Sequence, residues 1–219
     1  MATILCLETA TTNCSVALSV NGSVIAFKED QSPGYSHAEK LHPYIEEVLA
    51  IGEIDMDDLD AIAVSKGPGS YTGLRIGVSA AKGLCYVLDI PLISVPTLES
   101  MIITKDITAD YKVPMLDARR MEVYSAVFDA SNKRIRETRA EVLNDTSFAD
   151  LLEKGRAVFL GNGVAKFQKI VNHPNAVFMP NAMPSAIDMA GIAERKYKIS
   201  DTEDVAYFEP YYLKDFISG

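Results

Sequence analysis

The chain has 219 residues, of which 48% are apolar and 23% charged, a composition typical of a globular protein with one large domain or two smaller ones. Its net charge is -9, and the excess acid is concentrated in residues 1–103, which hold 13 acidic and 5 basic side chains. This charge argues against a chain that binds nucleic acid on its own. The sequence contains no membrane-length apolar run, no signal peptide and no CxxC pair among its three cysteines, so we expect a cytoplasmic protein without a membrane anchor, disulfide scaffold or zinc ribbon.

The first half predicts three strands followed by alternating helices and strands. Two β-runs separated by Asn21-Gly22 are a strong hairpin signal. Apolar residues recur with helical spacing over residues 36–52, and Ser36 with Glu39 fits a capping box. The expected elements are strands at 4–7, 15–20, 23–27, 61–64 and 92–95 and helices at 36–52 and 72–88.

The second half begins a new set of elements, and the acidic excess also stops near residues 100–110. We expect strands at 114–118, 122–128 and 157–160, helices at 148–154 and 185–198, and an irregular aromatic tail at 204–216. The order of elements predicts a mixed α/β protein with domains at 1–103 and 104–219. The helix at 185–198 belongs to the second domain or packs back on the first.

The sequence KGPGSYTGLRIG at residues 66–77 contains a tight turn that leads into a helix. Glycine and proline permit such a turn, and Ser70 or Thr72 can cap the helix that follows. A helix N-terminus suits an anion, but the pattern is not a P-loop, and a purely structural turn is the simpler interpretation. Thr9 and Thr11 carry hydroxyls after the first strand and serve equally as turn residues. The candidates for phosphate or nucleotide contact are Thr9, Thr11, Gly67, Gly69 and Ser70.

Small side chains recur every fourth residue along the helix at 72–88. Each glycine costs about 1 kcal/mol of helix stability relative to alanine, which indicates that something packs closely there. The partner is either the sheet of the same domain or a helix of another chain. The ridge consists of Gly73, Gly77, Ala81 and Cys85.

Candidates for catalysis, metal binding and RNA binding are few. His37 and His42 lie five residues apart and so do not share a helical face as an i, i+4 pair would, and no known nucleophile or metal motif is present, so we expect no catalytic residue and no metal site. One basic cluster stands out, although a run of charge is usually only a solvated face. It comprises Lys133, Arg134, Arg136 and Arg139, and Arg119 with Arg120 could extend it.

Taken together, these motifs resemble the TsaB (YeaZ) family, whose members serve bacterial synthesis of threonylcarbamoyladenosine in tRNA. The specific match is GPGSYTGLRIG at 67–77; ILCLETA at 4–10, SHAE at 36–39, DARRMEVY at 117–124 and PYYL at 210–213 support it in the same order. The resemblance implies two actin-like domains of the ASKHA, ribonuclease H-like type, with mixed sheets flanked by helices. It also implies a paralogue of the catalytic subunit TsaD. Thr97 and Met101 occupy the positions of that subunit's metal-binding histidines, and neither is a plausible ligand for its metal.

The resemblance therefore implies a non-catalytic scaffold subunit that has no cofactor of its own. It would pair with TsaD, recruit TsaE and meet tRNA through the complex, while ATP and a metal ion would be held by the partner subunits. Alone, the same surface would form a homodimer. We expect Gly77→Leu to abolish pairing without unfolding the monomer. The expected interface residues are His37, Leu41, Ile45, Gly73, Arg75, Gly77, Ala81 and Cys85.

Two other functions remain open at this stage. The first is a small-molecule kinase or ATPase, which tight ATP binding and turnover by the isolated chain would support. The second is a metallopeptidase, which metal analysis and an assay of the pure chain would test.

Overall fold

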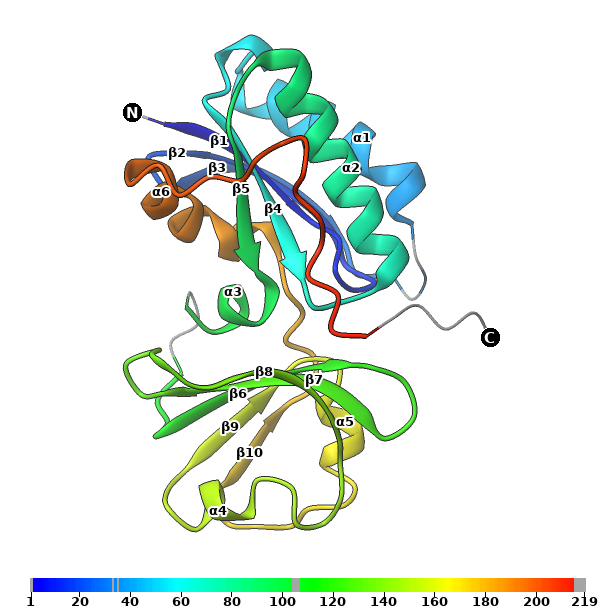
Figure 1. Ribbon diagram of the computed structural model, residues 1–219, viewed down its shortest axis with the longest axis vertical. Coiled ribbons are helices and arrows are strands. Elements are labelled where there is room, and N and C mark those ends of the chain that lie inside the picture. Colours follow the sequence, from blue (N-terminus) through cyan, green and yellow to red (C-terminus); the bar gives the residue numbers. More distant parts are fainter. Residues whose placement is uncertain (1, 33, 35, 104–106, 215–219) are drawn as a thin grey trace. The chain divides into compact units, whose positions relative to one another are not determined.

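The computed structural model describes residues 2–32, 34, 36–103 and 107–214 (Figure 1). These residues form two compact units: unit 1 is Met1–Ser100 with Pro184–Tyr212, and unit 2 is Met101–Met183 with Leu213–Gly219. Residues 184–212 thus belong to unit 1, whereas a simple division into 1–103 and 104–219 assigns them to the second domain. These residues belong to unit 1 because the helix at Ala190–Lys198 packs on the sheet of that unit.

Unit 1 is built on a five-stranded mixed sheet in the order β3-β2-β1-β4-β5. β1 pairs antiparallel with β2 and parallel with β4, so the hairpin strands lie on one side and the helix-linked strands on the other. The strands are β1 Thr3–Glu8, β2 Cys14–Val20, β3 Ser23–Asp30, β4 Ala61–Gly67 and β5 Leu92–Pro96.

Helices cover both faces of this sheet, as Figure 1 shows. Helices α1 (His37–Gly52) and α2 (Tyr71–Leu88) pack on one face, where their apolar residues join those of the strands in a single core. The short 3-10 helix η2 (Ala186–Met189) and helix α6 (Ala190–Lys198) pack on the other face. A further 3-10 turn, η1 (Met56–Asp58), precedes β4.

Two of the three local signals in unit 1 are confirmed. Asn21 and Gly22 both have positive φ, 51° and 77°, as a tight hairpin turn between β2 and β3 requires. The Ser70 hydroxyl caps α2 by accepting a hydrogen bond from the Gly73 amide at 3.3 Å. The predicted capping box at Ser36 is wrong, because the Ser36 hydroxyl donates to the Asp30 carboxylate instead.

Unit 2 is also a five-stranded mixed sheet, in the order β10-β9-β6-β7-β8. A cluster of phenylalanines fills the core on one face, with Phe159 at ring-centroid distances of 4.8 Å from Phe167 and 5.4 Å from Phe148. The elements are α3 Thr97–Ile103, which spans the division between units, β6 Tyr111–Asp117, β7 Glu122–Asp129, β8 Arg134–Val142, α4 Ala149–Leu152, β9 Ala157–Leu160, α5 Val164–Phe167 and β10 Ala176–Met179.

The two units repeat one topology. In each sheet the first three strands form an antiparallel meander. The fourth strand then pairs in parallel with the first, and the fifth pairs in parallel with the fourth. Strands β8 and β10 and helices α3 and α5 were not predicted from the sequence. Strand β8 was not predicted because its many arginines and glutamates resemble the composition of a charged loop.

The C-terminal tail from Glu203 to Tyr212 lies against unit 1. It contains no helix or extended strand, and only Glu203 forms an isolated bridge with Leu92 of β5. The Lys82 ammonium of α2 donates to the carbonyl oxygens of Ala206 and Phe208 at 3.1 and 3.0 Å. The tail is thereby attached along α2; Phe216, also expected in it, lies outside the described residues.

Candidate functional site

A buried carboxylate marks the carboxyl end of β1. Glu8 is fully buried, and its Oε1 accepts hydrogen bonds from the Ala10 amide at 2.6 Å and the Ser65 hydroxyl at 2.9 Å. Burial raises the pKa of the Glu8 carboxyl to about 7; these hydrogen bonds lower the pKa, whereas the nearby Asp188 charge raises it. In the sequence Glu8 stands only within the motif ILCLETA, because nothing local indicates that folding buries it near Asp188.

The loop after β1 and the turn before α2 are in close backbone contact. The Ser70 amide donates to the Ala10 carbonyl at 2.7 Å, and a Cβ added to Gly69 would lie 2.6 Å from the Ala10 Cβ. Gly67, at φ 107°, approaches the Tyr211 carbonyl, where a Cβ would lie 2.9 Å from the oxygen. The glycines of this turn are therefore explained by close backbone contact within the chain.

The five residues expected to contact phosphate all bind within the protein. The Thr9 hydroxyl donates to the Gly73 carbonyl at 2.8 Å, the Thr11 hydroxyl accepts from the Asn13 amide at 3.3 Å, and the Gly67 amide donates to the Thr97 hydroxyl at 3.2 Å. Gly69 and Ser70 contact Ala10 as described above. These donors and acceptors already have protein partners, so the geometry favours a structural turn over a phosphate-binding loop.

The ridge of small residues on α2 faces the interior of unit 1. A Cβ at Gly73 or Gly77 would overlap the carbonyl or the hydroxyl of Thr9, respectively, and Ala81 and Cys85 are buried in the core. The expectation that this ridge meets another chain is therefore corrected, because the end of β1 occupies its space. Gly77→Leu would disrupt the monomer itself.

The same correction applies to the expected interface residues on α1. His37, Leu41 and Ile45 are at most 2% exposed. The His37 Nε2–H donates to the Thr11 carbonyl at 2.7 Å, and burial lowers the pKa of this imidazole. Of the eight residues expected at the interface, only Arg75 is exposed, with its guanidinium 4.5 Å from the centre of the Tyr71 ring.

A different face of α2 is open to solvent. Tyr86 and Val87 are 83% and 79% exposed, unusual values for large apolar side chains. Gly83 lies one turn before them, and a Cβ added there would meet nothing within 4 Å. Ile51 at the end of α1 is 56% exposed. Residue spacing could have revealed this second face, but the buried ridge dominated the pattern.

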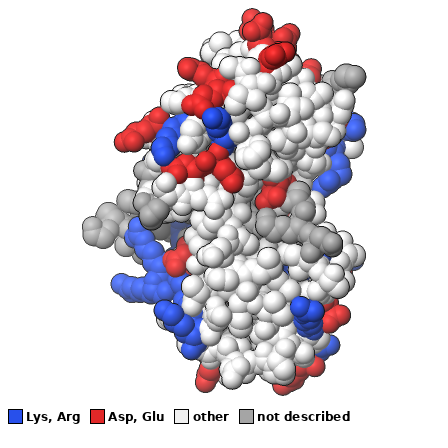
Figure 2. Space-filling model, turned by 180° about the vertical axis from the view of Figure 1, so that it is seen from behind, with Lys and Arg blue, Asp and Glu red and all other residues white. Residues whose placement is uncertain are grey.

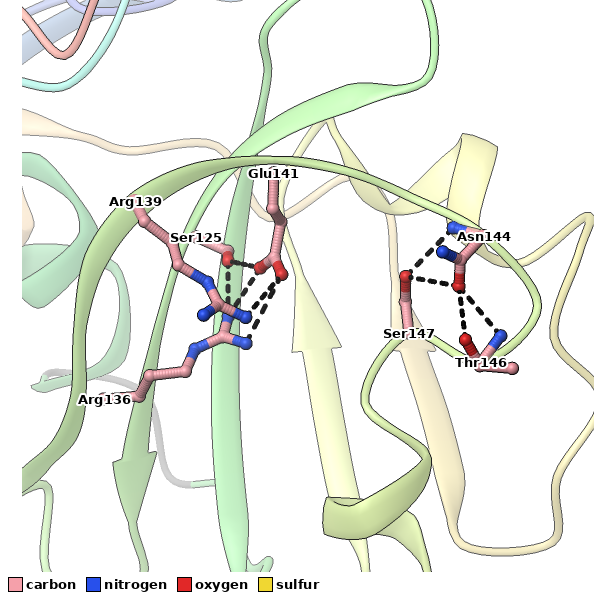
Figure 3. A network of polar contacts seen from close by, with 7 residues as sticks. All are labelled: Ser125, Arg136, Arg139, Glu141, Asn144, Thr146 and Ser147. Carbon is pink, nitrogen blue, oxygen red and sulfur yellow. Dashed lines mark hydrogen bonds and ion pairs between the residues drawn. The ribbon is translucent and has the colours of Figure 1, made fainter.

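The basic cluster expected to touch RNA forms part of β8, an edge strand of unit 2. Arg136 and Arg139 both bind Glu141, at 2.5 and 3.0 Å (Figure 3). The Arg136 guanidinium also lies 4.5 Å from the centre of the Phe148 ring. Arg134 pairs with Glu137 at 3.1 Å. Three of the four expected RNA contacts thus have acidic partners within the strand; Lys133 is exposed in the preceding turn.

A second polar cluster follows β8. The Asn144 Oδ1 accepts hydrogen bonds from the amide and hydroxyl of Thr146 and from the Ser147 hydroxyl, which fixes the turn toward α4 (Figure 3). These contacts are local and lie within three residues of Asn144, so they explain the turn without a ligand.

Within the described residues, no three His, Cys, Asp or Glu side chains are placed to hold a metal ion together. Thr97 and Met101, the two positions that the family resemblance singled out as lacking metal ligands, are fully buried in α3. None of the helices described is long and apolar enough to cross a membrane.

Comparisons with known proteins give a consistent result. A family model described as "TsaD: tRNA N6-adenosine threonylcarbamoyltransferase" matches residues 34–215. The chain is 30% identical to the tRNA threonylcarbamoyladenosine biosynthesis protein TsaB of Haemophilus influenzae, over 99% of this chain and 95% of that protein. It is 31% identical to the protein of the same name from Escherichia coli, over 98% and 96% of the two chains.

Solved structures support the same assignment. YeaZ from Pseudomonas aeruginosa has a TM-score of 0.80 and 25% identity, covering 97% of this chain and all of that one. A dehydratase activator from Clostridium difficile, at 9% identity and a TM-score of 0.53 over 91% of this chain and 97% of that one, shares the fold alone. The mixed α/β architecture is thus actin-like, as expected from the resemblance. With the repeated sheet topology and the GPGSYTG turn before α2, these matches show that the chain belongs to the TsaB (YeaZ) family.

Proposed function

We propose that this chain is a non-catalytic subunit of the machinery that makes threonylcarbamoyladenosine in tRNA. It pairs with TsaD, and the pair recruits TsaE. The family's role in this biosynthesis supports the proposal. ATP and the metal ion are held by the partner subunits, and the tRNA is met through the complex.

The observation that carries the pairing is the solvent-facing surface of α2. Gly83 lies inside α2 and costs about 1 kcal/mol of helix stability relative to alanine, yet no neighbour within the described chain needs the space that its missing Cβ leaves. Tyr86 and Val87 expose large apolar surfaces directly beside it. A glycine that lets a second helix approach, flanked by an aromatic anchor, is a typical interface arrangement.

This surface replaces the one expected from the sequence. We assign pairing to the face marked by Gly83, Tyr86 and Val87, with Ile51 of α1, and no longer to the buried ridge. Arg75 is kept from the original set because it is exposed on α2. Without TsaD, the same face would bring two copies together about a two-fold axis.

Gly83→Leu tests the assignment. The new side chain enters open space in the monomer but blocks close helix approach, so co-purification with TsaD should fall at least tenfold while the far-ultraviolet spectrum and melting temperature remain near those of the wild type. The matched control is Gly191→Leu on α6, where the nearest atom to an added Cβ is the flexible end of Arg195 at 3.7 Å. Pairing by Gly83→Leu at wild-type strength would contradict the proposal.

Reconstitution tests the function itself. Transfer of the threonylcarbamoyl group to tRNA by TsaD and TsaE should require this chain and should fall with Gly83→Leu in proportion to the lost pairing. Modification at full rate without the chain would overturn the proposed role. Tight ATP binding and turnover by the isolated chain would instead support a kinase or ATPase.

A further inference from the structure

The hairpin that joins β6 to β7 carries two adjacent arginines in an unusual backbone conformation. Arg119 and Arg120 have φ values of 69° and 47°, in the left-handed region that residues with a Cβ rarely adopt. The turn contains no glycine, although glycine or asparagine would adopt this conformation more easily. Both arginine residues are exposed.

The hairpin is held in place by a lysine from another element. The Lys166 ammonium of α5 lies 2.9 Å from the Asp117 carboxylate and donates to the carbonyl oxygens of Arg120 and Glu122 at 2.7 and 2.9 Å. The Asp117 carboxylate also accepts from the Arg119 amide at 2.7 Å. The backbone at the tip is therefore fixed while the two guanidinium groups project from it.

The charges at the tip differ from those of β8. Among the residues that the structure describes, Arg119 and Arg120 take part in no ion pair, whereas Arg136 and Arg139 share the Glu141 carboxylate. Burial raises the pKa of the Tyr124 phenol, and the charges of Lys214 and, to a smaller extent, Arg119 oppose this shift. Figure 2 shows one face on which Lys and Arg side chains gather along an edge of unit 2.

The shape of the tip favours a large anion over a small one. Asp117, Arg119, Arg120 and Met121 are all exposed, so the hairpin protrudes, whereas sites for small ligands enclose most of the ligand surface. Guanidinium groups bind phosphate oxygens in pairs of hydrogen bonds, and their planes stack on bases. A projecting pair of unpaired arginines therefore suits the backbone of a nucleic acid strand.

We propose that the Arg119–Arg120 hairpin contacts the phosphate backbone of RNA. The choice of RNA, and of tRNA in particular, rests on the proposed function. The contact orients the RNA within the complex, and because the net charge of -9 weakens binding of RNA by the isolated chain, the contact is measured at low salt. It also moves the expected RNA contact from β8 to the opposite end of β7.

The test uses the isolated full chain and a tRNA transcript, so its result does not depend on pairing with TsaD. Amide resonances of residues 118–122 are followed by heteronuclear NMR during titration at about 50 mM salt. The test variant is Arg119→Asn with Arg120→Asn, because asparagine tolerates the left-handed conformation and removes the charge. The matched control, Lys154→Gln with Arg156→Gln, removes the same charge from exposed positions just before β9, at the other end of the sheet.

We expect the hairpin resonances of the wild type and the control to shift with tRNA. Affinity of the asparagine variant should fall about tenfold or more, because each lost phosphate contact costs roughly that factor at this salt concentration. The melting temperature of the variant should be unchanged or higher, which a merely structural role for the arginines would not produce. Loss of affinity without loss of stability is the signature of a binding role.

Three results would overturn the inference. The first is a wild-type titration in which residues 118–122 do not shift. The second is equal weakening of both variants, which would indicate a general charge effect. The third is a saturable shift of the hairpin with a nucleoside triphosphate but none with tRNA, which would assign the tip to a small anion. None of these results bears on pairing through α2, which the Gly83→Leu experiment tests separately.

Discussion

The buried carboxyl of Glu8 makes the stability of unit 1 depend on pH in a direction opposite to that of ordinary acidic side chains. Burial raises its pKa from 4.5 to about 7, and the Asp188 charge adds to this shift despite the opposing hydrogen bonds from Ala10 and Ser65. The folded chain therefore keeps a proton that the unfolded chain releases between these two values. The stabilising contribution is complete below about pH 4.5 and is lost as the pH rises through about 7.

The size of the effect follows from the difference between the two pKa values. A shift from 4.5 to about 7 corresponds to a total of about 3 kcal/mol, of which about 2 kcal/mol should be lost between roughly pH 5.5 and pH 8. Glu8→Gln keeps an oxygen for the two donors and mimics the protonated carboxyl. The variant should therefore lack this pH dependence and unfold at higher denaturant concentration than the wild type at about pH 8.

The assay is urea unfolding of both proteins across this pH range, with the difference in unfolding free energy plotted against pH. Subtraction removes the contributions of groups that titrate in both proteins. Glu46→Gln, on the exposed face of α1, controls for the loss of one surface carboxylate. A constant difference between Glu8→Gln and the wild type from pH 5.5 to pH 8 would refute the reasoning, as would a wild type that gains stability relative to the variant at high pH.

Three further predictions concern packing within unit 1. Gly77→Leu should lower the free energy of unfolding by about 3 kcal/mol or prevent folding, because its side chain must displace Thr9; a normal urea midpoint would contradict this. Lys82→Met removes two hydrogen bonds to the tail, so amide exchange over residues 203–212 should accelerate, and unchanged protection would show that the tail is held by other contacts. The three buried cysteines should react with a thiol reagent only when the protein unfolds, because burial raises the pKa of Cys6, Cys14 and Cys85 to about 12, 11 and 12. Rapid reaction of any one of these thiols in the folded protein would contradict this prediction.

Local signals identified much of unit 1 correctly. The Asn21-Gly22 turn and the Ser70 cap depend on backbone conformations and hydrogen bonds within a few residues, so the sequence is enough to predict them. The helices α1 and α2 have strong apolar periodicity, and their predicted limits of 36–52 and 72–88 differ from the structure by one residue at the N-terminal ends. The family resemblance also rests on short motifs that can be read without coordinates.

Elements with weak local signals were missed. Strand β8 reads RIRETRAEV, with three arginines and two glutamates among nine residues, and it is stable because β7 pairs with it and Glu141 binds two of its arginines. Strand β10 has four residues and forms only as a parallel neighbour of β9. The repeated topology of the two units was not visible because it is a property of strand pairing, which the sequence does not display as a period.

The candidate sites show most clearly where sequence reasoning ends. Helical spacing predicted a ridge of small residues on α2, but spacing alone cannot say whether the ridge faces the same domain or another chain. The close contacts of Gly73 and Gly77 with Thr9 decided this. Likewise, Glu8 became notable only because folding buries its carboxyl and brings Asp188 near it across 180 residues of sequence. Sequence determines which faces a helix has, because the periodicity is local; which face is buried depends on long-range packing, and only the tertiary structure supplies it.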